Sequence, residues 1–196
     1  MQDAEADAQA VARVRAGEPE AFRVLMERHG RAVHRLAFRM TGNEQDAEDV
    51  VQESFLRAFR NLDHFEARAQ FGSWLYRIAA NCSYDLLRAR ARRLARTEPA
   101  DATPDLDASV PTGDPGPDRL LAGAEVRRRI RAAMSRMSAL ERSAFTLRHL
   151  EGMSIAEIAQ ALDLQGEAAK QSVFRAVRKL RGALAEHAQG ALRAKA

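Results

Sequence analysis

The chain has 196 residues, with 31 Lys+Arg against 27 Asp+Glu, a formal net charge of +4 and a pI of about 9.8. Its one cysteine, Cys82, excludes a disulfide framework and a multi-cysteine zinc site. The longest uncharged run, residues 69–76, is too short to cross a membrane, and the acidic N-terminus differs from a secretory signal, so we expect a cytoplasmic protein.

Outside residues 97–118 the apolar residues recur at helical spacing, without the alternation typical of strands. The spacing predicts a helix from Pro19 to about Gly30, with Phe22, Leu25 and Met26 on its inner side. A second helix is expected over residues 33–40, stopping at Gly42. The fold class that this pattern predicts is all-α.

A third helix is expected to begin after Asn43, which can cap it while the Asp46 side chain reaches back to the cap. Asp46, Asp49 and Glu53 then lie at i, i+3 and i+7, beside Gln52, as an acidic stripe. Carboxylates so spaced can serve acid–base catalysis or hold a hard metal ion. No histidine or further acid clusters with them in sequence, so the stripe favours contact with an arginine-rich partner.

Seven of the eleven aromatic residues lie between residues 55 and 84. A helix predicted from Ser73 to about Arg93 has an apolar stripe and, beside it, a polar one: Arg77, Asn81, Tyr84, Asp85, Arg88 and Arg92. Aromatic rings interleaved with arginine and asparagine suit single-stranded DNA, because unstacked bases stack on the rings. The alternative is that the aromatics are core residues, which is our expectation for Phe55 and Phe59.

Residues 97–118 contain six acidic groups, no basic group and five of the six prolines. Such a composition cannot build a core and disfavours helix, so it predicts an extended, disordered linker; an ordered loop packed on one domain is the alternative. The linker divides the chain into domains 1–96 and 119–196, and the second has 15 basic against seven acidic residues. That excess suggests a polyanionic partner.

The C-terminal domain has two Ser-x-x-Glu capping boxes, Ser138–Glu141 and Ser154–Glu157. The second opens a short helix that ends at a turn where Gly166 is expected to take a positive φ. The next helix has an apolar face and an opposite polar face: Lys170, Gln171, Arg175, Arg178, Lys179 and Arg181. This is the pattern of a helix-turn-helix that reads a major groove. An ordinary helical hairpin with a solvated basic face is the alternative, and the basic excess favours DNA.

These motifs, taken together, resemble the bacterial sigma-70 family. Residues 46–59, 71–81 and 85–88 resemble its second conserved region, and residues 140–154 and 170–181 resemble its fourth. The first and third regions are missing, which is the layout of the extracytoplasmic-function (ECF) subfamily. The resemblance implies a sigma region 2 domain over 1–96 and a sigma region 4 domain over 119–196, in a subunit that gives core RNA polymerase its promoter specificity.

The resemblance also implies roles for individual residues. The helix expected to dock on an arginine-bearing coiled coil of the largest polymerase subunit contributes Asp46, Asp49, Gln52 and Glu53. The loop 63–72 and the helix after it are expected to read and melt the −10 element through Phe71, Trp74, Arg77, Asn81, Asp85 and Arg88. The last helix is expected to read the duplex −35 element through Lys170, Gln171, Phe174, Arg175, Arg178 and Lys179.

Further partners and alternatives follow from the same residues. Many relatives are held inactive by an anti-sigma factor, which the resemblance makes a candidate partner. We find no phosphate loop, nucleophile elbow or zinc spacing, and expect no catalytic residue, metal or cofactor. A stand-alone helix-turn-helix regulator explains 119–196 equally well, but not the aromatic helix or the acidic stripe. An RNA-binding antiterminator is a third possibility, and it would prefer transcript to promoter duplex.

Overall fold

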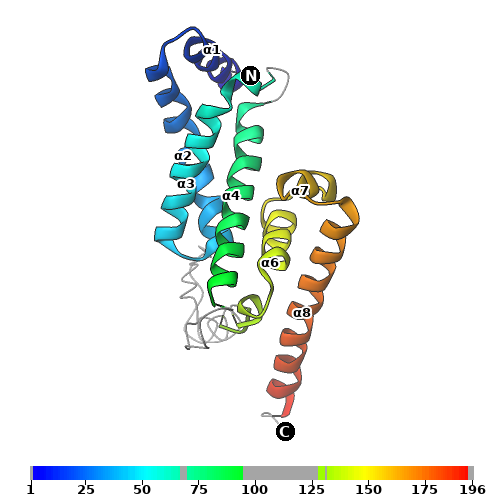
Figure 1. Cartoon of the computed structure of the whole chain (residues 1–196). Helices are drawn as coiled ribbons and strands as arrows, with labels where there is room; N and C mark the ends of the chain where they lie inside the picture. Colours follow the sequence, from blue (N-terminus) through cyan, green and yellow to red (C-terminus); the bar gives the residue numbers. More distant parts are fainter. Residues whose placement is uncertain (1, 67–69, 95–127, 131, 194–196) are drawn as a thin grey trace.

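The computed structural model describes residues 2–66, 70–94, 128–130 and 132–193, and every regular element in these ranges is helical, as predicted (Figure 1). The N-terminal elements are α1 (Gln2–Arg15), η1 (Pro19–Ala21), α2 (Phe22–Thr41), α3 (Glu44–Arg60), η2 (Leu62–His64) and α4 (Phe71–Leu94). The C-terminal elements are α6 (Ala139–Phe145), η3 (Thr146–Leu150), α7 (Ile155–Ala161) and α8 (Gly166–Arg193). The predicted linker, 97–118, lies outside the described residues.

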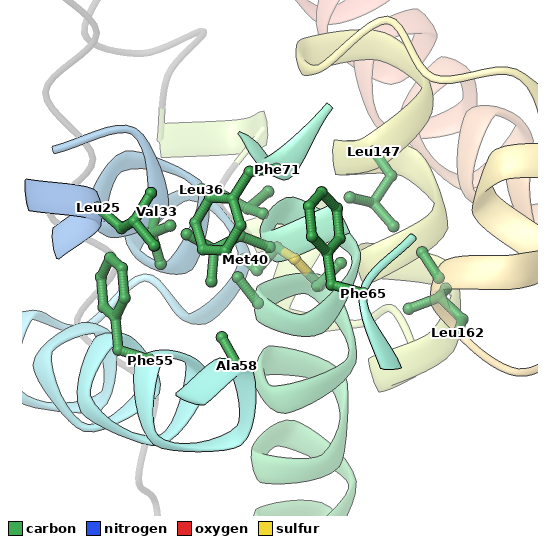
Figure 2. Close-up of a cluster of buried hydrophobic side chains, with 14 of the residues drawn as sticks. Leu25, Val33, Leu36, Met40, Phe55, Ala58, Phe65, Phe71, Leu147 and Leu162 are labelled. Carbon is green, nitrogen blue, oxygen red and sulfur yellow. The ribbon is translucent and has the colours of Figure 1, made fainter. Parts of the chain in front are cut away.

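Helices α2, α3 and α4 form a bundle around one apolar core (Figures 1 and 2). Figure 2 shows Leu25, Leu36 and Met40 gathered between these helices, and all three are fully buried. Phe55 is buried in the same core, as expected. The expectation for Phe59 was wrong, because its side chain is exposed, although its ring packs edge-on against Phe22 at 5.1 Å.

Helix α2 is continuous where the sequence predicts two helices. It passes through Gly30 because Leu25 before the glycine and Val33 after it lie on the same buried face. Their burial outweighs the roughly 1 kcal/mol that a glycine costs inside a helix. The helix ends at Gly42, as predicted, with φ 71° at that residue. Met26, expected on the inner side, is exposed instead.

The start of α3 is partly as predicted. The Asn43 side chain caps it by accepting a hydrogen bond from the Asp46 N–H at 2.9 Å. The Asp46 carboxylate does not reach back to the cap; it accepts from Arg90 of α4, also at 2.9 Å. A charged partner on the next helix therefore replaces the local bond. Helix α4 also begins two residues before the predicted Ser73, at Phe71.

In the C-terminal domain both predicted capping boxes are present, at Ser138–Glu141 and Ser154–Glu157. The turn between α7 and α8 differs from the prediction, since Asp163 takes the positive φ of 51° and Gly166 does not. Aspartate tolerates the left-handed region better than most residues. The Leu164 N–H then bonds to the Ala159 carbonyl at 2.8 Å, which closes the turn and sets the direction of α8.

The two domains are packed against each other, and α4 contacts both α6 and α7 (Figure 1). Leu147, Ile158 and Leu162 of the C-terminal domain belong to the same buried cluster as the N-terminal core. Figure 2 shows Leu147 and Leu162 on the C-terminal side of that cluster. The domains therefore share apolar surface in this structure.

Candidate nucleic-acid interface

The acidic stripe lies on the outer face of α3, because the opposite face is held in the core by Val50, Phe55 and Ala58. Asp49 and Gln52 are exposed. Glu53 is ion-paired with Arg57 at 2.6 Å, and Asp46 is partly covered by its pair with Arg90. The stripe thus presents its most accessible carboxylate at Asp49, between two partly neutralised ones.

Arg57 joins this stripe to the next helix. Besides Glu53, its guanidinium contacts the Asp85 carboxylate of α4 at 3.3 Å. The hydrogen bond that Arg57 donates to Glu53 is the main reason that the pKa of Arg57 is raised, so the residue is a fixed positive charge. Asp85, predicted to face the −10 element, therefore has an intramolecular partner.

The aromatic end of α4 is built from rings that support one another. Trp74 is half-buried, with its ring 5.1 Å from Phe65 and 5.7 Å from Phe71. Phe71, which the resemblance places at the −10 element, is only 3% exposed. In this structure its ring lies beneath Trp74 rather than toward solvent. A direct DNA contact by Phe71 would require this ring cluster to open.

Trp74 and Asn81 line one surface pocket of about 330 Å³. The other walls are Ile78 of the same helix and three polar residues from the end of α3 and from η2: Arg57, Asn61 and His64. Sequence reasoning placed His64 in the loop 63–72 expected at the −10 element, but it did not single out Arg57 or Asn61, which meet α4 only in the folded chain. The pocket offers one aromatic face and several hydrogen-bonding groups, which is the combination that holds an unstacked base.

Helix α8 presents a basic face with one apolar member. Lys170, Gln171, Arg175 and Arg178 are exposed, while Ala169, Ala176 and Leu180 are buried on the opposite side. Phe174 is 61% exposed, the highest value among the exposed large hydrophobic side chains of the described chain. An aromatic side chain left in water amid basic residues indicates a contact surface.

Lys179 is exposed, but its side chain is paired within the C-terminal domain. Its ammonium lies 2.6 Å from the Glu141 carboxylate, which the Ser138 N–H also contacts at 2.9 Å. Burial alone would raise the pKa of Glu141, but these bonds outweigh it and lower that pKa. Lys179 therefore connects α8 to α6 in this structure.

Polar contacts between described residues also connect the two domains. Glu151 accepts a hydrogen bond from Arg39 of α2 at 2.7 Å and another from the Tyr76 hydroxyl of α4. Arg77 of α4 donates to Gln160 of α7 at 3.1 Å. The Glu151 side chain is 8% exposed, and burial together with this carboxylate raises the pKa of Tyr76. Arg77, a predicted −10 residue, is thus engaged by the other domain.

Asn81 and Arg88 complete the predicted set on α4. Asn81 is half-buried at the pocket and Arg88 is exposed one to two turns further along. In the described part of the chain no group of three or more His, Cys, Asp or Glu side chains is placed to hold a metal ion. Among the helices described here, none has the length and apolarity needed to cross a membrane.

Comparison with known proteins adds independent information. A family model described as Sigma-70 region 2 matches residues 25–93, and one described as Sigma-70, region 4 matches residues 127–180. The RNA polymerase sigma-H factor of Pseudomonas aeruginosa is 33% identical over 88% of this chain and 90% of that protein. The ECF RNA polymerase sigma factor SigE of Mycolicibacterium smegmatis is 32% identical over 83% of this chain, which spans 61% of that longer relative.

Two solved structures share the arrangement of helices. CnrH in complex with the cytosolic domain of CnrY is 28% identical, with a TM-score of 0.57 over 92% of this chain and 98% of that one. The sigma factor RpoE, in complex with the anti-sigma factor NepR from Bartonella quintana, has a TM-score of 0.60 at 23% identity, over 83% of this chain and 96% of that one. The second likeness shows the fold.

Proposed function

The chain belongs to the ECF subfamily of the sigma-70 family, and from that premise we propose that three of its helices divide the work of transcription initiation. Helix α3 docks on core RNA polymerase. Helix α4, with the loop before it, reads and melts the −10 element, and α8 reads the −35 element. The observation that carries the proposal is that these three helices each present a face of different chemistry: acidic on α3, aromatic on α4 and basic on α8. The protein then acts in the cytoplasm with the polymerase and catalyses no reaction itself.

Docking on polymerase is assigned to the stripe Asp46, Asp49, Gln52 and Glu53. Carboxylates on a helix face attract an arginine-bearing surface, and the attraction weakens with salt. Asp49 is the exposed carboxylate of the stripe, so we expect Asp49 to contribute most, while Asp46 and Glu53 would first have to exchange their partners Arg90 and Arg57.

Promoter melting is assigned to the pocket at Trp74 and Asn81. A base flipped out of the duplex would stack on the indole and meet the hydrogen-bonding groups of Asn81 and His64. Arg88, exposed beyond the pocket, suits the phosphate backbone. Phe71 supports this surface from beneath.

Reading of the −35 element is assigned to the first turns of α8. Lysine and arginine can bond bidentately to guanine and glutamine to adenine, while an exposed phenylalanine can contact the methyl group of thymine. Lys170, Gln171, Phe174, Arg175 and Arg178 supply these groups. Lys179 can join them only by leaving Glu141.

Use of both DNA surfaces requires the domains to separate, because Arg77 is bonded to the C-terminal domain in this structure. Promoter elements two helical turns apart lie roughly 70 Å from each other. A 22-residue linker spans about 26 Å on average as a flexible coil and about 75 Å when fully extended. The polymerase would therefore hold the domains apart.

A protein inhibitor is the second partner that we propose. The sigma factor RpoE was solved in complex with an anti-sigma factor, and CnrH in complex with the cytosolic domain of CnrY. These complexes support an anti-sigma factor as a partner for this chain.

The docking surface is tested with Asp49→Lys and a matched control, Glu48→Lys, on the same helix. Glu48 is exposed but points about 100° away from Asp49 around the helix. We expect Asp49→Lys to weaken binding to core RNA polymerase at least tenfold and Glu48→Lys to change it less than twofold. Binding is measured by titrating labelled protein with core enzyme. Equal losses in the two variants would contradict the assignment.

A further inference from the structure

Helix α1 is hydrogen-bonded to the main chain of residues 62–65, which lies beside the pocket. One terminal nitrogen of the Arg15 guanidinium donates to three main-chain carbonyls, of Leu62 at 2.6 Å, Asp63 at 3.2 Å and Phe65 at 2.5 Å. These residues form η2 and the start of the stretch that joins it to α4. Charge-assisted hydrogen bonds to several carbonyls fix a backbone more firmly than neutral ones. A single side chain, almost fifty residues away in sequence, thus sets the path of this segment.

The far end of the same segment is held from α1 as well. Asp7 is 7% exposed and accepts hydrogen bonds from Arg28 and from His29 Nε2, each at 2.9 Å. The His29 ring lies so close to Gly72 that a Cβ there would approach it to 3.1 Å. It also packs 5.4 Å from the Phe71 ring. The start of α4 is therefore seated on an imidazole that α1 orients.

The aromatic cluster of Phe65, Phe71 and Trp74 connects these two sets of contacts. Phe65 carries one of the carbonyls that Arg15 binds, and the Phe71 ring packs against the His29 ring. Both rings pack on Trp74, the aromatic wall of the pocket. A displacement of the main chain at Arg15 or of the His29 ring would therefore move the rings that pack on the Trp74 indole.

We propose that α1 is a positioning element for −10 reading, with Arg15 and the Asp7–His29 pair as its positioning residues. This inference rests on the proposed role of Trp74 and Asn81. None of these three residues faces the pocket, and the sigma region 2 match, residues 25–93, does not include α1. Arg15 acts through the backbone of η2, and Asp7 through His29 and Gly72.

The direct test uses the fluorescence of Trp74, the one tryptophan of the chain. Arg15→Ala is compared with Arg13→Ala, because Arg13 lies on the same helix but pairs with the nearby Glu18 at 2.6 Å. We expect Arg15→Ala to shift the emission of the free protein and to increase acrylamide quenching about twofold, and Arg13→Ala to leave both unchanged. Identical spectra for wild type and Arg15→Ala would overturn the structural part of the inference, whatever the protein does with DNA.

The functional test measures promoter discrimination with core RNA polymerase. The ratio of run-off transcript from the preferred promoter to that from a single-base −10 variant should fall at least fivefold in Arg15→Ala, with Asp7→Asn showing the same direction. The corresponding −35 ratio should stay within twofold of wild type, and Arg15→Lys should recover part of the −10 ratio. A loss of stability alone would lower both ratios together, and that result, or an unchanged −10 ratio, would overturn the proposal.

The two failures remain distinguishable. If wild-type protein gives no selective transcript, the proposed function fails while the fluorescence result still decides whether Arg15 positions Trp74. If Arg15→Ala does not fold, as judged by circular dichroism, Arg15→Lys and Asp7→Asn are subjected to the same two criteria.

Discussion

Glu141 and Lys179 show how one ion pair can fix the relation between two helices. Glu141 closes the capping box of α6 and also receives the ammonium of α8, so one carboxylate serves both. Because these bonds stabilise its charged form, its pKa is lowered relative to 4.5. A carboxyl with a lowered folded-state pKa contributes stability above its unfolded pKa and loses it as the pH falls through the folded value.

We therefore predict that Glu141→Gln lowers the stability of the protein at pH 7 by about 1 kcal/mol. The difference from wild type should shrink as the pH falls below 4.5 and vanish in more acidic solution, as seen in denaturant titrations at several pH values. Glu167→Gln is the control, since Glu167 is exposed and its ion pair with Lys170 is long, at 3.8 Å. A loss that does not depend on pH would contradict the role of the charged carboxylate.

Cys82 offers a second test at the scale of one residue. The sequence predicts a small core residue there, and the structure confirms that the side chain is buried. Burial raises the pKa of its thiol, so the reactive thiolate is scarce at neutral pH. We predict that a thiol reagent modifies the native protein about 100-fold more slowly than the unfolded chain. Equal rates under native and denaturing conditions would show that α4 does not protect this residue.

At the scale of the element, local sequence determines several helix ends by itself. The two Ser-x-x-Glu boxes begin α6 and α7 because each serine and glutamate satisfy main-chain N–H groups that the first turn leaves unpaired. Ser73, where the sequence predicts the start of α4, lies inside that helix, which begins at Phe71.

This difference predicts the effect of two serine substitutions. Ser154→Ala should destabilise the C-terminal domain by about 1 kcal/mol, because the Glu157 N–H loses its acceptor. Ser73→Ala should change stability by less than about 0.5 kcal/mol. Thermal unfolding followed by circular dichroism compares the two, and equal effects would contradict the capping argument.

The sequence could predict α3, α4, α7 and α8 because each has an apolar stripe at helical spacing and most have a recognisable cap. It could not predict α1, whose buried apolar residues are few, Ala10 and Val11, and whose attachment relies on polar contacts made by Asp7 and Arg15. It also placed a helix end at Gly30, because the burial that carries α2 through the glycine is a tertiary effect.

In the candidate site, too, local sequence predicts some features and tertiary contacts determine the others. The residues of the acidic, aromatic and basic stripes share helix faces, which periodicity reveals. The resemblance placed the loop 63–72, which includes His64, beside Trp74. It could not place Arg57 and Asn61 at the same pocket, because they reach it from the end of α3. Nor could the sequence predict the partners of Asp85 and Lys179, since Arg57 and Glu141 are distant in sequence.

At the scale of the whole molecule, the domains are joined by apolar contact and by a few polar contacts centred on Glu151. Removing Glu151 leaves the half-buried Tyr76 hydroxyl without its acceptor, while Arg39, whose side chain is 45% exposed, can turn to water. The substitution should therefore act mainly on the closed arrangement, where these contacts exist.

We predict that Glu151→Ala favours separated domains by about 2 kcal/mol, which is roughly a thirtyfold change in the opening equilibrium. Small-angle X-ray scattering should show a larger radius of gyration for this variant than for wild type, and Glu167→Ala should leave it unchanged. Superimposable scattering curves for Glu151→Ala and wild type would show that Glu151 does not hold the domains together.

The account depends most on the claim that this chain directs RNA polymerase to promoters. The measurement that tests it most directly is run-off transcription by bacterial core RNA polymerase on a library of promoter-like duplexes, with and without the protein. We predict sequence-selective initiation only when both components are present, with preferences in two elements about two helical turns apart. Specific DNA binding by the protein alone, with no co-elution with core enzyme and no selective transcript, would contradict the account and favour a stand-alone regulator.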